Sequence, residues 1–413
     1  MQLGKKLVLS VIATSTTIPI ILDAATGDSL NLKHMYYTES DNRIDIDFTL
    51  LDFKKDFGAD YSLSVSASHD SISGGTPVWD SKSGGSSVAT SDVVSGPSPC
   101  VNEAQEYLCA DTRTDNIIGD GFTTSEDNVY RNVHITDKRK AISASLTKRT
   151  LRRDEITVGL SHSKESDYKS SELALSYLYN LTEKRNRSFS VGISHQANDE
   201  FFYRDKSWKG INITNFQVGY THTLSKKTVA QANFFAIKQS GALSNPYQTI
   251  VRKFDVSLDD NPYYKYYLST EKRPDNKNAA GLSFDFSSKV LGNTALHGFY
   301  RLYKDDWGVL SHTVSANAFI DLGKNWTLAP LVRFYKQSEA SFYKNSGSED
   351  YTFNQTDYGS ADERLGAFNS MTYSLGVEKK VNNKLKLDAF VSKQHQSNGL
   401  DLNWVHVGLN YSF

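Results

Sequence analysis

Hydrophobic and polar positions alternate with a period of two along much of the chain. The clearest case is residues 404–413, where Val405, Val407, Leu409, Tyr411 and Phe413 alternate with His406, Gly408, Asn410 and Ser412. Alternate side chains of a strand point to opposite faces of a sheet, so the segment predicts a strand with one apolar and one polar face. Taken alone, it would also suit the edge of a soluble sandwich.

The same alternation recurs upstream and predicts about 16 strands, an even number as in single-chain membrane barrels. They are expected at residues 30–37, 44–50, 61–67, 142–146, 156–160, 173–179, 189–195, 216–224, 230–236, 282–286, 296–302, 314–322, 326–334, 371–377, 385–391 and 405–413. Pro330 is the exception within a strand. It lacks a backbone donor, so we expect a bulge or a local break there.

The connections between these segments alternate in length. Short turns are expected at 52–59, 149–155, 181–187, 225–227, 287–294, 323–325 and 380–384, and longer polar segments at 70–140, 197–212, 239–278, 338–369 and 393–401. Short periplasmic turns and long outer loops are typical of transmembrane β-barrels, and a soluble sandwich has no reason to separate loops by length. We therefore expect an all-β, antiparallel up-and-down transmembrane barrel.

The row predicted to face the barrel lumen carries charges of both signs among many small polar residues. These charged residues are Asp45, Asp47, Asp285, Arg301, Asp321, Arg333, Glu378, Lys386 and Asp388. Strong ion selectivity is therefore not implied.

The composition fits this architecture and argues against nucleic acid as a partner. The chain has 413 residues, a formal net charge of -1 and a mean hydropathy of -0.48, with 23 Tyr and 21 Phe. No basic excess is available to neutralise nucleic-acid phosphates, whereas abundant aromatic residues suit the interfacial girdles of a barrel. Beyond the N-terminal segment, no apolar run reaches the roughly 18 residues of a membrane helix.

Both ends of the chain carry features of an exported protein. Lys5 and Lys6 precede an apolar stretch up to Leu22, so residues 1–25 are expected to be a secretory signal and residues 26–413 one barrel domain. The cut site stays open, because Leu22 or Asp23 occupies a position where a small residue is preferred. Tyr411 and Phe413, on the apolar face, resemble the terminal signal that the barrel assembly machinery of Gram-negative bacteria recognises. We expect an outer-membrane location.

The longest loop contains both cysteines, Cys100 and Cys109. In an exported chain two nearby cysteines most simply form a disulfide, and the alternative is a metal or redox pair. The same loop holds a near-repeat rich in Ser, Gly, Asp and Pro, at 70–77 and 92–99, and we expect each copy to form a defined turn.

These repeats and three further motifs resemble an uncharacterised family of Gram-negative outer-membrane barrels, a domain of unknown function. The motifs are Gly241 to Tyr247, Tyr300 to Gly308 followed by Ser311 and His312, and the weaker Asp362 to Leu365. The resemblance covers most of the mature chain and implies mainly fold and location. Members are often associated with exported redox proteins, which implies possible partners but no activity. The cysteine pair is not a feature of the family.

One cluster is a candidate site: Arg301, Tyr303, Asp305, Asp306, Trp307 and His312. The end of one strand and the start of the next should bring these side chains to the outer rim. They would bind a ligand or partner, or form a structural cap in which Arg301 pairs with Asp305 or Asp306. No spacing of a catalytic triad, haem-attachment or metal motif is present, so we expect no enzyme activity, no cofactor and no metal.

Two functions follow from this interpretation. The first is a channel or transporter for an unidentified small solute, because about 16 strands leave an aqueous lumen. The alternative is a structural sleeve or docking platform for extracytoplasmic redox or surface partners. An open lumen would favour the first, and a lumen plugged by the 239–278 or 70–140 loop the second. Expected partners are outer-membrane lipid, the barrel assembly machinery and exported redox proteins.

Overall fold

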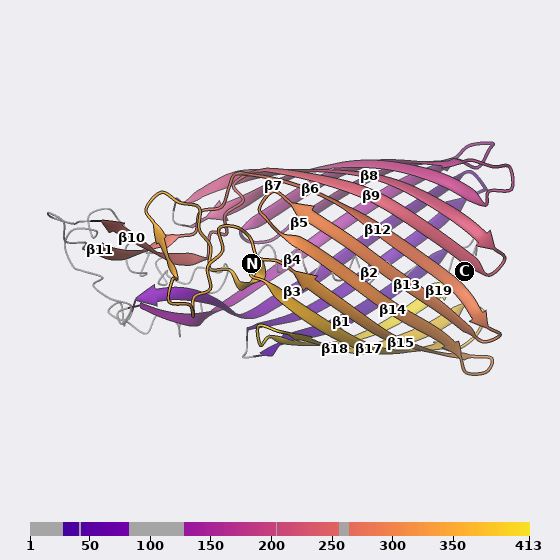
Figure 1. Ribbon diagram of the computed structural model, residues 1–413. Coiled ribbons are helices and arrows are strands. Elements are labelled where there is room, and N and C mark those ends of the chain that lie inside the picture. Colours follow the sequence, from indigo (N-terminus) through magenta and orange to yellow (C-terminus); the bar gives the residue numbers. More distant parts are fainter. Residues whose placement is uncertain (1–27, 41–42, 82–127, 204, 256–263) are drawn as a thin grey trace.

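The computed structural model describes residues 28–40, 43–81, 128–203, 205–255 and 264–413. Sixteen antiparallel strands close into one barrel (Figure 1). The barrel strands are β1 (Ser29–Glu39), β2 (Ile44–Phe57), β3 (Tyr61–Ser81), β4 (Asn128–Arg149), β5 (Glu155–Lys164), β6 (Tyr168–Asn180), β7 (Arg187–Phe202), β8 (Ser207–Ser225), β9 (Thr228–Gly241), β12 (Asn276–Leu291), β13 (Thr294–Asp305), β14 (Leu310–Asp321), β15 (Trp326–Gln337), β17 (Phe368–Lys380), β18 (Leu385–Gln396) and β19 (Asp401–Ser412). The fold class and the strand number predicted from the sequence are confirmed.

The barrel closes where the first strand meets the last. Leu32 of β1 lies opposite Leu409 of β19 on one side and Leu51 of β2 on the other. Consecutive strands pair with each other around the rest of the wall, and the tight turns lie at the end that also holds the C-terminus (Figure 1). Several strands are longer than expected. Most of the predicted 197–212 loop belongs to β7 and β8.

The outward face carries an apolar band around the barrel. Leu160, Leu173 and Val391 are examples, with exposed fractions of 60%, 56% and 56%. A closed barrel with such a band presents a surface suited to lipid, because a water-soluble monomer rarely exposes so much apolar area. None of the described residues forms a helix long and apolar enough to span a membrane.

Beyond the apolar band, the outer end of the barrel carries a second, smaller sheet. It consists of β11 (Tyr264–Thr270), β10 (Thr249–Asp255) and β16 (Thr352–Asn354), in that order, and the short 3-10 helix η3 (Glu363–Leu365) follows β16. These elements come from the two segments between β9 and β12 and between β15 and β17. β3 and β4 also extend past the band at this end (Figure 1).

The structure confirms the break expected at Pro330. Leu328 and Leu331 have partners on β14, but Ala329 and Pro330 do not. The other side of β15 continues its pairing with β17 through Pro330. The missing donor therefore faces β14, and the register is the same on both sides of the gap.

Two predictions about the first three strands were wrong. The first repeat copy, 70–77, is part of β3 rather than a turn. Pairing with β2 ends at Gly74, so Pro77 lies on a free edge where no donor is required. Asp45 and Asp47 face outward, because Ile44, Ile46 and Phe48 take the inward positions.

These inward side chains form an apolar patch on the inner wall. Its buried members are Tyr37, Ile44, Ile46, Phe48, Ile72 and Leu402. The lumen is therefore not lined by polar residues throughout. The second repeat copy, the signal segment and Cys100 and Cys109 lie outside the described residues, so the disulfide stays a prediction.

Candidate functional site at the barrel mouth

The second sheet and η3, together with the loops that carry them, form a cap over the outer mouth of the barrel. We use the word cap for residues 242–275 and 338–367, as far as they are described. Its sheet encloses a small core of Ile250, Val251, Leu268, Phe353 and Ala361. A second core joins Ala340, Phe342 and Leu365 of the cap to Trp307 and Val309 of the β13–β14 hairpin. The cap is therefore packed against the barrel rim.

A buried ion network holds the two cap segments together. The Arg273 guanidinium contacts Glu271, with Nε 2.5 Å from Oε1, and Asp362, with Nη2 3.0 Å from Oδ2. The Ser360 hydroxyl and the backbone N–H of Asn245 also donate to Glu271. Arg273 and Glu271 are 2% and 3% exposed, respectively. Removal of Arg273 would leave two buried carboxylates without their shared counter-charge, which is strongly destabilising.

Electrostatics around Asp362 favour its charged form. Burial by itself raises the pKa of this carboxyl, but Arg364 and Arg273 outweigh that effect and hold the pKa well below its ordinary value of 3.8. Asp362 also accepts from the backbone N–H of Arg364 at the start of η3. The carboxylate is therefore both the N-cap of η3 and the ion-pair partner of Arg273.

Two contacts tie the cap to distant parts of the barrel wall. Arg43, in the β1–β2 connection, donates to Glu363 of η3 over 2.7 Å. On another side, the Tyr247 hydroxyl donates to Asp167 in the β5–β6 turn. β10 and β11 also lie against β3. Since the cap originates between β9 and β12 and between β15 and β17, these contacts place it across the mouth.

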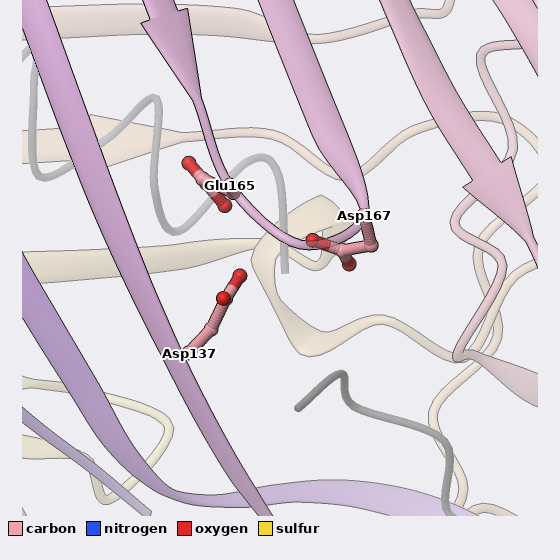
Figure 2. Close-up of side chains that lie close together, drawn as sticks. All are labelled: Asp137, Glu165 and Asp167. Atoms are coloured by element: carbon pink, nitrogen blue, oxygen red, sulfur yellow. The ribbon is translucent and has the colours of Figure 1, made fainter. Parts of the chain in front are cut away.

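Asp167, which accepts the hydrogen bond from Tyr247, belongs to a cluster of three buried acids. Asp137 of β4 and Glu165 and Asp167 of the β5–β6 turn each offer an oxygen within 4.8 Å of the others (Figure 2). Ser166 donates to Asp137 over 2.9 Å, and Arg139 lies 4.0 Å from Glu165 while it bonds Asp70 at 2.8 Å. Clustered carboxylates can hold a hard cation such as Ca²⁺. Here the carboxylates already accept hydrogen bonds from Ser166 of the barrel wall and from Tyr247 of the cap.

The structure brings together only part of the predicted rim cluster, around Asp305. Its Oδ1 accepts from the backbone N–H groups of Trp307 and Val309, at 3.1 and 2.9 Å. Its Oδ2 accepts from the Tyr303 hydroxyl at 2.9 Å and lies 3.0 Å from Nζ of Lys277. Gly308, with φ of +97°, completes the turn in a conformation that other residues rarely adopt. Asp305 thus organises the hairpin that supports the cap.

The expected pairing of Arg301 with an acid is wrong. Its guanidinium lies 4.6 Å from the Phe235 ring centre, and no described residue forms an ion pair with it. Arg301 is four residues below Asp305 on one strand, so their backbones are about 13 Å apart. The cation that pairs with Asp305 is instead Lys277 of the neighbouring strand β12.

The other two rim residues lie apart from this centre. Asp306 accepts from the backbone and side-chain nitrogens of Asn278, at 3.0 and 2.8 Å. His312 shares a hydrogen bond of 2.9 Å with the Tyr300 hydroxyl on the outward face. Neither points toward Asp305. Whether the cluster is structural or binds a ligand stays a prediction.

Sequence reasoning missed Lys277, Glu271, Arg273 and the three-acid cluster. The charged run 271–273 before β12 was one available signal, and the acids of 165–167 in a turn were another. The motif at Asp362 to Leu365 was noted without a role. Partners that lie more than 80 positions apart, such as Arg273 and Asp362, cannot be paired from sequence spacing.

A cavity of about 30 Å³ lies where the cap meets the rim. Arg273, Lys277, Trp307 and Asp362 are among the residues that line it. This volume suits one or two water molecules and is far too small for a drug-sized ligand. The cavity is therefore part of the polar contact between the cap and the rim.

Comparison with solved structures finds outer-membrane proteins among the matches. A bacterial polysaccharide outer membrane secretin is 7% identical, with a TM-score of 0.48 over 95% of this chain and 100% of that one. CdiB from Acinetobacter baumannii is 9% identical, with a TM-score of 0.48 over 94% and 60%. A loop-deletion mutant of OmpT from Vibrio cholerae is 8% identical, with a TM-score of 0.39 over 94% and 98%.

Among curated proteins, none matches the chain. One family model matches nearly all of it, in two overlapping stretches, at residues 7–206 and 200–403. Together these stretches contain β1 to β18, the rim hairpin and both cap segments. The chain therefore belongs to the family described as protein of unknown function (DUF3570).

Proposed function

We propose that the protein is an outer-membrane channel or transporter for a small solute, and that the cap gates its outer mouth. The observation that carries this proposal is a closed barrel of 16 strands whose mouth is crossed by the cap. Barrels of 16 to 18 strands leave an aqueous channel, whereas about eight strands are filled by side chains.

The inner wall supports passage of a polar solute. Many inward positions are small and polar, as at Thr372, Ser374 and Ser392, and the last two share a hydrogen bond of 2.7 Å. Charges of both signs also face inward, as at Lys386 and Glu378, which lie 3.7 Å apart. A lumen of this kind favours neither cations nor anions strongly.

The cap also favours the second candidate, a docking platform for extracytoplasmic redox or surface partners. A pore that is always open needs no cap, and the buried network of Arg273, Glu271 and Asp362 holds one across the mouth. Under the platform hypothesis, the cap would be a permanent lid that presents a surface to a partner. The two functions differ in whether release of the cap opens a conducting path.

The experiment is single-channel recording of the purified protein in planar bilayers. Glu363→Ala combined with Tyr247→Phe removes both ties across the mouth. We expect this variant to raise the open probability on the order of tenfold or more, because each lost hydrogen bond to a charged group is worth about 1.5 to 3 kcal/mol. The wild-type protein should conduct in brief openings.

A conservative change and a neutral change serve as controls. Glu363→Asp keeps a carboxylate for Arg43 and leaves the Tyr247 tie in place, so this variant should stay closed. Asp350→Asn removes an exposed carboxylate from the same loop, 2.8 Å from Lys344, and should change nothing. If the released variant assembles but does not conduct, the channel is excluded and the docking platform becomes the better proposal.

A further inference from the structure

Three lysines lie side by side on the outer wall of the barrel. Lys140 of β4 is directly opposite Lys164 of β5, and Lys164 is directly opposite Lys169 of β6. All three share the parity of outward-facing neighbours such as Ile142 and Leu160, and Lys138 follows one outward position above Lys140. Directly opposed side chains start only about 5 Å apart at Cβ. We call Lys140, Lys164 and Lys169 the lysine row.

No described residue forms an ion pair with the lysine row. The Lys169 ammonium lies 4.2 Å from the Trp208 ring centre, although Asp199 stands opposite Lys169 on β7. Like charges directly opposite each other destabilise a sheet. Asp199 offsets part of the charge at Lys169, whereas Lys140 and Lys164 have no acid directly opposite them. The row is therefore a cost, mainly at Lys140 and Lys164, unless an anion outside the chain neutralises it.

The row lies where the lipid-facing surface ends. Immediately below it, Ile142, His162 and Ser171 face outward, and the next row contains Leu160 and Leu173. The β4–β5 turn lies at the opposite end of these strands, and the row stands next to the β5–β6 turn at the outer end, so the row marks the outer boundary of the apolar band. Polar headgroups lie at this depth when acyl chains cover the row below.

Other outward lysines at the same end stand alone. Lys238 faces Thr214 and Asn278, Lys304 faces Ala280 and Leu310, and Lys336 faces His312 and Asn369. The concentration of positive charge is therefore specific to β4, β5 and β6 rather than a general property of the rim.

We propose that the lysine row binds the phosphate groups of an anionic lipid in the outer leaflet. The acyl chains of that lipid would lie on the apolar surface beneath, and its phosphates would neutralise the opposed ammonium groups. This inference rests on the outer-membrane location in the proposed function, but not on conduction through the lumen.

The test measures binding of a phosphorylated lipid to the full-length barrel in detergent. Lipid A with two phosphate groups is compared with the same lipid after removal of its phosphates. The variant K140Q/K164Q/K169Q is compared with the matched control K238Q/K304Q/K336Q, which removes three isolated lysines. We expect the first to bind phosphorylated lipid A on the order of 100-fold more weakly and the control to remain within a few-fold of wild type.

A second measurement separates binding from damage to the fold. Without lipid, the lysine-row variant should unfold at the same temperature as wild type or higher, because repulsion is removed. If it does not assemble, Lys164→Gln alone should weaken binding roughly fivefold. Conductance recorded in parallel should stay unchanged, so that failure of this inference is distinct from failure of the channel proposal.

Three results would overturn the inference. One is equal binding of phosphorylated and dephosphorylated lipid A by the wild-type protein. Another is equal loss of binding in the lysine-row variant and the control. The third is complete displacement of lipid by millimolar inorganic phosphate, which would show a site for free phosphate instead.

Discussion

Asp305 shows how a single carboxylate can stabilise the turn between two barrel strands. It accepts from two backbone N–H groups and a tyrosine hydroxyl and pairs with Lys277, all in a buried position. We expect Asp305→Asn to lower the free energy of unfolding by about 1 to 3 kcal/mol, because hydrogen bonds to a buried charged group are lost or weakened. Heat denaturation in detergent, followed by mobility on a gel, measures the change.

Asp306→Asn is the matched control for this prediction. Asp306 is adjacent in sequence but exposed, and its partner is Asn278 alone. Its replacement should shift the unfolding free energy by less than about 0.5 kcal/mol. Equal effects of the two substitutions would contradict the central role given to Asp305.

At the scale of elements, the cap depends on the charge of Asp362. Because the pKa of this carboxyl in the folded protein lies below its value in an unfolded chain, its ionised form stabilises the cap above about pH 4. That contribution is lost as the pH falls below 3.8 toward the lower folded value. Open probability and protease cleavage within the cap should therefore both rise in acid.

Asp362→Asn tests the assignment of this pH dependence. The variant should have a looser cap at neutral pH and a flatter profile below pH 4. Asp350→Asn changes an exposed carboxylate of the same loop, and its profile should follow that of wild type. A profile that stays steep in Asp362→Asn would place the acid response in another group.

At the scale of the whole molecule, closure of the barrel depends on the last strand. Phe413 donates its backbone N–H to Asp28 over 3.0 Å, and its exposed ring stacks on Phe53 and Tyr411. Deletion of Phe413 should impair assembly and leave degraded or periplasmic protein, as expected for a terminal aromatic read by the assembly machinery. Heat-modifiable migration of the membrane fraction measures assembly.

Phe53→Ala separates the assembly signal from ring packing. This substitution removes the same stacking contact but keeps the terminal aromatic residue, so the protein should still assemble. Normal assembly of the Phe413 deletion, or an equal defect in both variants, would show that Phe413 acts through packing instead.

The sequence alone determined the barrel, because alternation with a period of two is a local property of each strand. Every strand from 30–37 to 405–413 was predicted, as were most of the short turns, since each depends only on residues close together in the chain. Of the expected turns, most of 52–59 and of 287–294 belongs to β2 and β12 instead. The break at Pro330 followed from the chemistry of one residue. Strand ends were less well predicted, because polar extensions such as those of β7 and β8 carry no apolar alternation.

Tertiary structure decided which distant side chains meet. The alternation within β2 predicts the wrong face for Asp45 and Asp47. Ile44, Ile46 and Phe48 face inward because they pack against Tyr37 of β1 and Ile72 of β3, and this contact cannot be read from β2 alone. Lys277 rather than Arg301 reaches Asp305 because register sets the height of each residue on the wall. Arg273 and Asp362, and Lys140 and Lys164, became neighbours only through folding, since contacts between separate segments depend on the closed barrel.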